Sequence, residues 1–138
     1  TLYGHPINTE ELAYGFLACA RVASAVLDHA GVRIPRLNKN GRETSELAMA
    51  VYEVEHRLVK LRWTKITAPN DLRPGDVIVW RSKDNRNSNY ACSGGGNCHV
   101  GIITSRGAFN NDIQQIFPAF TPIDIGPAFP FKVGYRAP

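Results

Sequence analysis

The spacing of hydrophobic residues changes once along the chain, near Leu61, and this change constrains the fold more than any other feature. Before it, apolar residues recur three and four positions apart, as on one face of a helix. In the clearest stretch they are Cys19, Val22, Ala23, Val26, Leu27 and Ala30. Gly31 and Pro35 then end the helix. After the change, Val77–Trp80 forms a short β-branched and aromatic run typical of a buried strand.

Helices that precede strands predict an α+β domain, with N-terminal helices packed on a small antiparallel sheet. An early helix is expected to start at Asn8–Glu11, and a second helix near Thr44 or Ser45, after a polar loop over 36–42. A strand is expected over His99–Thr104. Further short strands are expected around 108–111, 114–117 and 132–136, and an irregular segment between Pro118 and Pro130. Residues 1–138 are therefore interpreted as one domain.

Length and composition exclude several classes of protein. The chain has 138 residues, 43% of them hydrophobic and 20% charged, which excludes fibrous and disordered proteins. The longest hydrophobic stretch, 16–27, is interrupted by Arg21 and is too short to span a membrane. Because the chain starts at Thr1, it is interpreted as a trimmed or mature fragment. The net charge of +4 suits an anionic polymer such as a cell wall, without the dense basic stripe of a nucleic-acid-binding protein.

The three cysteines suggest two different roles. Cys92 and Cys98 enclose the glycine-rich segment Ser-Gly-Gly-Gly-Asn, so a disulfide between them is easy to form and indicates a secreted or periplasmic protein. Cys19 is the cysteine left over, either a reactive thiol or a small buried hydrophobic residue. A position near a helix N-terminus is expected to lower the pKa of its thiol. His99, which opens a strand, is the best placed base for it; His29 and His56 are expected on helices and at the surface.

Three short motifs carry a family resemblance. Leu72–Val77 reads Leu-Arg-Pro-Gly-Asp-Val, His99–Ile102 reads His-Val-Gly-Ile, and Val133–Arg136 closes the chain. With Cys19 at a helix start, this order over residues 13–136 resembles the NlpC-type cell-wall peptidases and the CHAP amidases, which are papain-like cysteine hydrolases. The resemblance implies a papain-like fold and a cysteine amidase or endopeptidase that hydrolyses peptide amides of peptidoglycan without a cofactor. Around Cys19 the chain reads Ala-Cys-Ala-Arg, where many members have Asp-Cys-Ser-Gly.

The resemblance also implies the remaining site residues. Cys19 is the nucleophile and His99 the base. The residue that orients the histidine lies about a dozen positions beyond it, on the next strand, where a side-chain carbonyl can accept the Nδ1 proton of His99. The count falls on Asn111, with Asn110 and Asp112 as neighbours, although the three could also form only a turn. Tyr14 and Tyr3 are candidates for binding the oxyanion, together with the backbone N–H of Cys19.

Other functions are open to this sequence. Cys92, Cys98 and His99 could bind zinc, but no fourth ligand stands at a suitable spacing, so no metal is expected. Basic residues between Arg57 and Lys65 favour a solvated surface over a polyanion site. A non-catalytic module that binds the wall or a partner protein on the same fold is the main alternative. Another papain-like chemistry, acyl transfer or protein cleavage, is the second. An inhibitor or immunity protein is not identified by the sequence.

Overall fold

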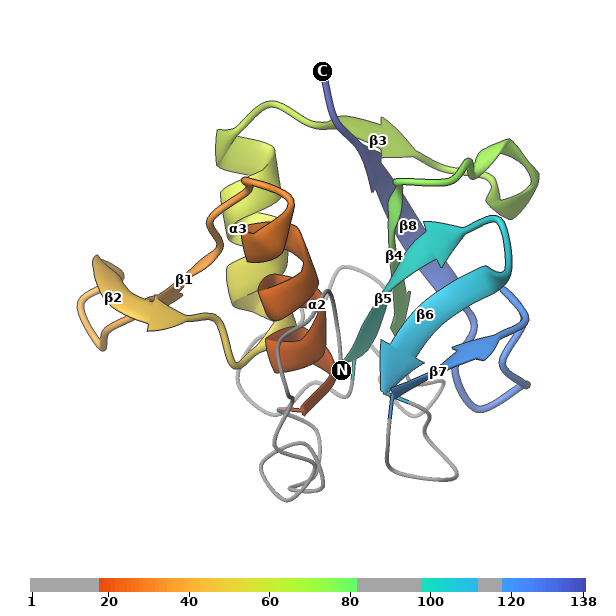
Figure 1. The fold of residues 1–138 in the computed structure, drawn as a ribbon, viewed down its shortest axis with the longest axis horizontal. Helices are drawn as coiled ribbons and strands as arrows, with labels where there is room; N and C mark the ends of the chain where they lie inside the picture. The colour runs from red at the N-terminus through yellow and green to blue at the C-terminus, as the bar shows by residue number, and fades with distance from the viewer. Residues whose placement is uncertain (1–17, 82–97, 112–117) are drawn as a thin grey trace.

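The computed structural model describes residues 18–81, 98–111 and 118–138. Two helices lie on one side of a six-stranded antiparallel sheet, and a two-stranded hairpin extends beyond them (Figure 1). The predicted α+β class is thereby confirmed. The helices are α2 (Ala18–His29) and α3 (Val51–Lys60), and the hairpin strands are β1 (Pro35–Leu37) and β2 (Glu43–Leu47). The sheet strands are β3 (Thr64–Ile66), β4 (Val77–Arg81), β5 (Cys98–Thr104), β6 (Gly107–Asn111), β7 (Pro118–Thr121) and β8 (Phe131–Arg136).

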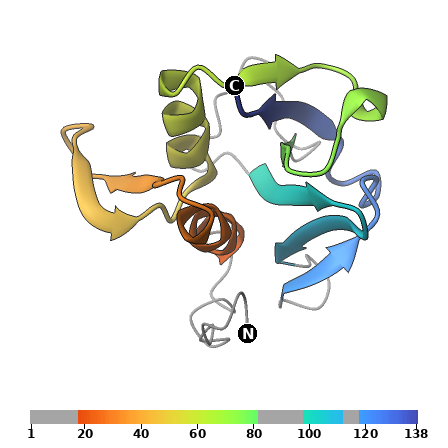
Figure 2. The ribbon, with the colours of Figure 1, turned by 45° about the horizontal axis from the view of Figure 1, so that its top comes forward.

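Helix α2 follows the predicted apolar pattern. Val22, Ala23, Val26 and Leu27 are buried, and Gly31 follows the helix at a φ of 91°, the left-handed conformation that ends many helices. The helix lies between the hairpin and the sheet, as the tilted view shows (Figure 2). The cysteine helix therefore packs on the face of the sheet, as the sequence predicted. The proposed early helix at Asn8–Glu11 lies outside the described residues.

The second helix begins later than predicted. Residues 43–47 form β2, paired with β1, so the expected surface loop over 36–42 is partly a hairpin. Helix α3 starts at Val51, where the Glu53 carboxylate accepts the main-chain N–H groups of Met49 and Ala50 at 3.0 and 2.9 Å. Its other oxygen accepts the N–H of Leu37, which ties the helix start to the hairpin. The Glu53 carboxylate, at the third helical position, thus reaches back to the N–H groups of the N-cap residue Ala50 and of the residue before it.

The six-stranded sheet has the order β3-β8-β4-β5-β6-β7. Strands β4, β5 and β6 lie side by side in chain order, whereas β8 is inserted between β3 and β4. The predicted strands at Val77–Trp80, His99–Thr104, 108–111 and 132–136 are all present, within a residue or two. The segment from Pro118, expected to be irregular, instead begins with β7, which lies at the edge of the sheet, where strand prolines are tolerated. The strand proposed at 114–117 lies outside the described residues.

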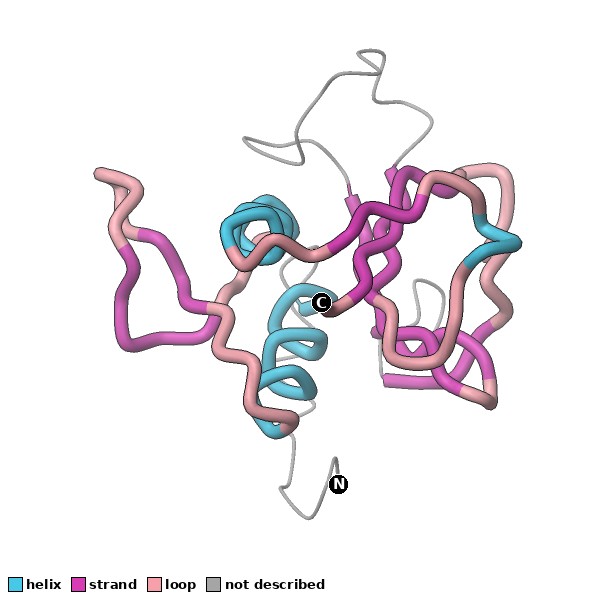
Figure 3. The backbone as a smooth tube through the Cα atoms, turned by 90° about the horizontal axis from the view of Figure 1, so that it is seen from above, coloured by secondary structure: helices cyan, strands magenta, loops and turns pink. Residues whose placement is uncertain are grey.

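The sheet separates two hydrophobic clusters, because successive side chains of a strand point to opposite faces. On the helix face, Val77, Val79, Val100 and Ile102 join the buried residues of α2 and α3. On the outer face, Ile78, Trp80, Ile103 and Ala108 pack under side chains from the loops around the sheet. Those covering residues are Leu72, Ile123, Ile125, Phe129 and Phe131. Seen from above, helices and sheet form separate layers (Figure 3).

The turn before β4 is fixed by one buried carboxylate. Asp76, 2% exposed, accepts the N–H of Arg73 at 2.8 Å and two hydrogen bonds from the Arg136 guanidinium at 2.9 and 2.8 Å. Such a paired geometry is among the stronger interactions of a protein. The Pro-Gly-Asp motif thus connects the turn to β8. No helix among the described residues is long and apolar enough to cross a membrane.

Candidate active site

Cys19 lies in the first turn of α2 and is almost fully buried on the helix face of the sheet. The main-chain N–H groups of Val100, Ala20 and Cys19 itself act on its sulfur and lower its pKa. Two of these belong to the start of the helix, and the third belongs to β5. The thiol therefore meets β5 at the residue that directly follows His99.

Burial outweighs these N–H groups. Loss of solvation raises the pKa of the Cys19 thiol from 9.0 to about 11, because a thiolate is poorly stabilised in apolar surroundings. The sequence predicted a lowered pKa from the helix N-terminus, and that expectation is wrong for this conformation. The electrostatic effect of the helix start is present, but it is smaller than the cost of removing the sulfur from water. Cys19 carries a thiol and forms no disulfide.

His99 occupies the outer face of β5. Its ring lies 5.4 Å from that of Trp80 and 6.1 Å from that of Phe129, measured between centroids, and only 5% of the residue is exposed. Its Nε2 atom lies 2.9 Å from Oδ1 of Asn110. A buried histidine with an amide partner is thus present, as the sequence predicted. The amide is supplied by Asn110, and it faces Nε2 where Nδ1 was expected.

Asn111 was the predicted partner, and the strand register explains the difference. Thr104 pairs with Gly107 across a two-residue turn, so Gly101 lies opposite Asn110. Side chains two residues apart share a face, so His99, Gly101 and Asn110 all lie on the outer face. Asn111 is also buried, but alternation directs it to the helix face. The turn length, which is readable from the sequence, was the signal that could have identified Asn110.

The Asn110 side chain fits closely under its neighbours. A Cβ atom placed on Gly101 would lie 3.0 Å from Asn110 Cβ, 3.0 Å from the Phe109 carbonyl oxygen and 3.2 Å from the Trp80 ring. These distances are shorter than ordinary packing contacts, so a side chain at this position would displace Asn110 or Trp80. The glycine of the His-Val-Gly-Ile motif therefore preserves the room in which the His99–Asn110 pair forms.

The two predicted catalytic residues are brought to the same strand but to different faces. Cys19 contacts β5 at Val100 from the helix face, and the His99 ring packs with Trp80 on the outer face. A thiol and its base must come within hydrogen-bond distance for catalysis. The structure therefore brings Cys19 to the residue that follows His99 on β5.

Four predicted residues lie outside the described part of the chain: Tyr3, Tyr14, Cys92 and Asp112. The Cys92–Cys98 disulfide accordingly stays a prediction, with Cys98 buried at the start of β5. Across the described residues, no group of three or more histidine, cysteine or acidic side chains could hold a metal ion.

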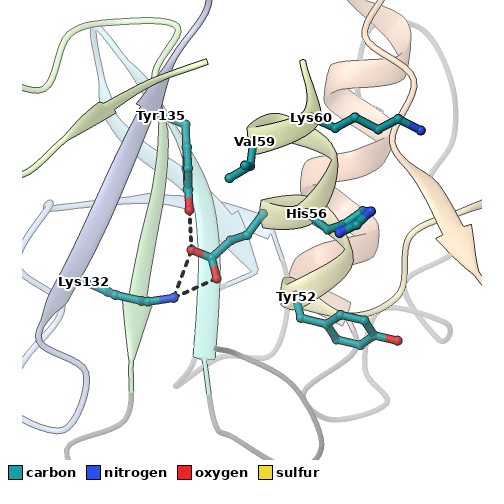
Figure 4. Close-up of a pocket in the computed structure, with 7 residues that line it drawn as sticks. Tyr52, His56, Val59, Lys60, Lys132 and Tyr135 are labelled. Atoms are coloured by element: carbon teal, nitrogen blue, oxygen red, sulfur yellow. Dashed lines mark hydrogen bonds and ion pairs between the residues drawn. The ribbon is translucent and has the colours of Figure 1, made fainter. Parts of the chain in front are cut away.

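A pocket of about 640 Å³ lies elsewhere, between α3 and β8 (Figure 4). Glu55 lies in it, and its carboxylate accepts hydrogen bonds from the Tyr135 hydroxyl at 2.7 Å and from Lys132 Nζ at 2.8 and 3.0 Å. The bonds satisfy the carboxylate and join α3 to β8. Burial and the Glu55 carboxylate raise the pKa of Tyr135 far above its usual range, so the phenol stays protonated. No motif in the sequence indicated this cluster.

Comparison with known proteins adds no relative. No family model, no curated protein and no solved structure matches the chain.

Proposed function

We propose that this domain is a papain-like cysteine hydrolase that cleaves peptide amide bonds of peptidoglycan in the bacterial cell envelope. Cys19 is the nucleophile, His99 the general base and acid, and Asn110 the residue that orients His99. The observation that carries the proposal is the contact of Cys19 with the Val100 amide, directly beside a buried His99 whose Nε2 is bonded to Asn110. The substrate class rests on the resemblance of the Leu72–Val77 and His99–Ile102 motifs.

The reaction needs no group beyond these side chains and water. His99 takes the proton of the Cys19 thiol, and the sulfur attacks the amide carbonyl. The C–N bond then breaks, the imidazolium gives its proton to the leaving amine, and a thioester remains. Water, activated by His99, hydrolyses the thioester to a carboxylic acid and restores the thiol. We assign the N–H of Cys19, at the helix start, as a donor to the oxyanion.

The proposal requires a rearrangement on substrate binding. The thiol is buried with a pKa raised to about 11, and the His99 ring lies on the outer face. Catalytic hydrogen bonds often form fully only in the complex with substrate. Substrate binding would have to favour transfer of the thiol proton to His99, and Cys19 already contacts the residue that follows His99 on β5.

The raised pKa of Cys19 and the packing of His99 on the outer face also favour a second function. A buried thiol with a raised pKa and a histidine bonded to a buried amide suit a non-catalytic module that binds the wall or a partner protein. Under this alternative, Cys19 is a small hydrophobic core residue and the His99–Asn110 pair stabilises the outer face.

Digestion of purified peptidoglycan separates the two. The wild-type protein is incubated with the wall, and the soluble fragments are analysed by mass spectrometry. New amine and carboxyl termini that are absent with Cys19→Ala support the hydrolase. If the protein sediments with the wall and releases no fragments, the binding module is correct. Alkylation of Cys19 with and without wall fragments then shows whether substrate activates the thiol.

A further inference from the structure

The orientation of the Asn110 amide is fixed by acceptors. Its Nδ2 atom lies 3.0 Å from the carbonyl oxygen of Ala108 and 2.9 Å from Oγ1 of Thr121. A carbonyl oxygen can only accept, so the atom facing Ala108 must be the nitrogen. The amide oxygen is therefore the atom that faces His99.

This orientation determines where the histidine carries its proton. Oδ1 of Asn110 is an acceptor, and it lies 2.9 Å from Nε2 of His99. Nε2 must then be the donor, and in a neutral imidazole the other nitrogen, Nδ1, holds the basic lone pair. Nδ1 is the nitrogen that the proposed reaction uses.

The Thr121 hydroxyl supports the arrangement from β7. It has one proton, and Oγ1 lies 3.0 Å from the Pro122 carbonyl oxygen and 3.5 Å from that of Ala108. Both of these are acceptors, so the proton is donated to one of them, with the closer Pro122 preferred. The oxygen is left to accept from Asn110. Thr121 thus acts as an acceptor that holds the second N–H of a fully buried amide.

We propose that Thr121 is a positioning residue which, through Asn110, holds the proton of neutral His99 on Nε2 and leaves Nδ1 as the base. The role in turnover rests on the proposed hydrolase function, whereas the tautomer does not. Without the Thr121 hydroxyl, one Asn110 N–H is buried with its acceptor removed, and the Ala108 carbonyl alone opposes rotation of the amide. A rotated amide would offer nitrogen to His99 and favour the opposite tautomer.

The test is the ¹⁵N NMR spectrum of the imidazole at alkaline pH, where the ring is neutral. Protonated and bare ring nitrogens resonate far apart, and His99→Gln identifies the His99 signals by their loss. Thr121→Val removes the hydroxyl at nearly constant shape, and Thr121→Ser retains it. Thr104→Val is the matched control, because its hydroxyl bonds the Gly107 carbonyl in the same sheet and not Asn110.

We expect Nε2–H in the wild type, in Thr121→Ser and in Thr104→Val, and a shift towards Nδ1–H in Thr121→Val. Turnover of wall fragments should fall about tenfold in Thr121→Val at unchanged KM, as for loss of about one buried hydrogen bond. An Nδ1–H signature in the wild type overturns the inference, even if no variant folds. A Thr121→Val protein that keeps Nε2–H also overturns it, whatever its turnover. If the tautomers follow the expectation but the wild type releases no wall fragments, the hydrolase function fails and the tautomer assignment stands.

Discussion

The two faces of the six-stranded sheet provide different surroundings for Cys19 and His99. On the helix face, Cys19 lies in a cluster of aliphatic residues from α2, α3 and the sheet, and burial raises the pKa of its thiol. On the outer face, His99 lies between aromatic rings but has Asn110 as a hydrogen-bond partner, itself held by Thr121. Burial on the helix face disfavours ionisation of the Cys19 thiol. The hydrogen bond on the outer face sets which ring nitrogen of His99 carries the proton.

Under the proposed hydrolase function, Cys19 and His99 are prepared to different degrees for the same reaction. The base is oriented before any substrate arrives, because its partners are buried and directional. The nucleophile is positioned but not ionised. Substrate binding must therefore change the surroundings of the Cys19 thiol, at the helix start and the beginning of β5. It needs to change less around His99 on the outer face.

Removal of the thiol should have the largest effect. Cys19→Ala is expected to fold and to lose wall hydrolysis by at least about a thousandfold, since a covalent nucleophile has been removed. Fragment release measured by mass spectrometry is the readout. Ser24→Ala is the matched control on the same helix, because Ser24 is fully buried and small, and this variant should keep its turnover. Full activity of Cys19→Ala would end the assignment of the nucleophile.

Substitution of the two neighbouring asparagines of β6 tests which of them orients His99. Asn110→Ala should lower turnover by about tenfold to a thousandfold, because His99 loses the partner of its Nε2 atom. Asn111→Ala, one residue along and on the helix face, should have a smaller effect. Steady-state rates of the two variants decide between them. A larger loss with Asn111 would mean that the active conformation pairs His99 differently from the structure.

The buried thiol should also affect stability at high pH. Its pKa is raised from 9.0 to about 11 on folding, so the folded state holds this proton more tightly. The resulting stabilisation is complete below about pH 9 and is lost as the pH rises towards 11. Over that range the unfolding free energy of the wild type should fall by about 2–3 kcal/mol more than that of Cys19→Ala, as measured by urea denaturation. Parallel curves for the two proteins would mean that the thiol is solvated.

The smallest effect is expected from a substitution in the pocket between α3 and β8, which contains neither Cys19 nor His99. Lys132→Met should lower the unfolding free energy by about 1–2 kcal/mol, because the partly buried Glu55 keeps Tyr135 but loses its cation. Turnover should be unchanged. A variant with normal stability and impaired hydrolysis would instead make this pocket part of the functional site.

Regular, buried elements were predictable from the sequence, and exposed ones were not. Helix α2 and strands β4 and β5 have continuous apolar patterns that reflect their burial. The hairpin strand β2 carries Glu43, Thr44, Ser45 and Glu46, mostly exposed, so it has no alternating apolar signal to detect. The same polar residues resemble a helix cap, which is why α3 was predicted to start too early. Its true start depends on Glu53 and on Leu37, a contact from outside the helix.

The candidate site was predictable in its residue types and not in its geometry. Cys19 and His99 are both buried where their elements were expected. The orienting residue was misassigned by one position, and one position in a strand exchanges the two faces. The raised pKa of Cys19 depends on how deeply α2 packs against β5, which local sequence does not determine. The Asn110–Thr121 bond joins strands whose pairing is a property of the whole sheet.

The position of β8 has a consequence for the order in which this chain can assemble. β8 follows every other described strand in the sequence, yet it lies between β3 and β4 and supplies Arg136 to Asp76. During synthesis β4 therefore leaves the ribosome with one edge open and with the Asp76 carboxylate still hydrated. The sheet closes only when residues 131–136 arrive, and pairing over such a sequence separation is slow. Until then the unpaired edge of β4 is the part of the nascent chain most exposed to aggregation or to a chaperone.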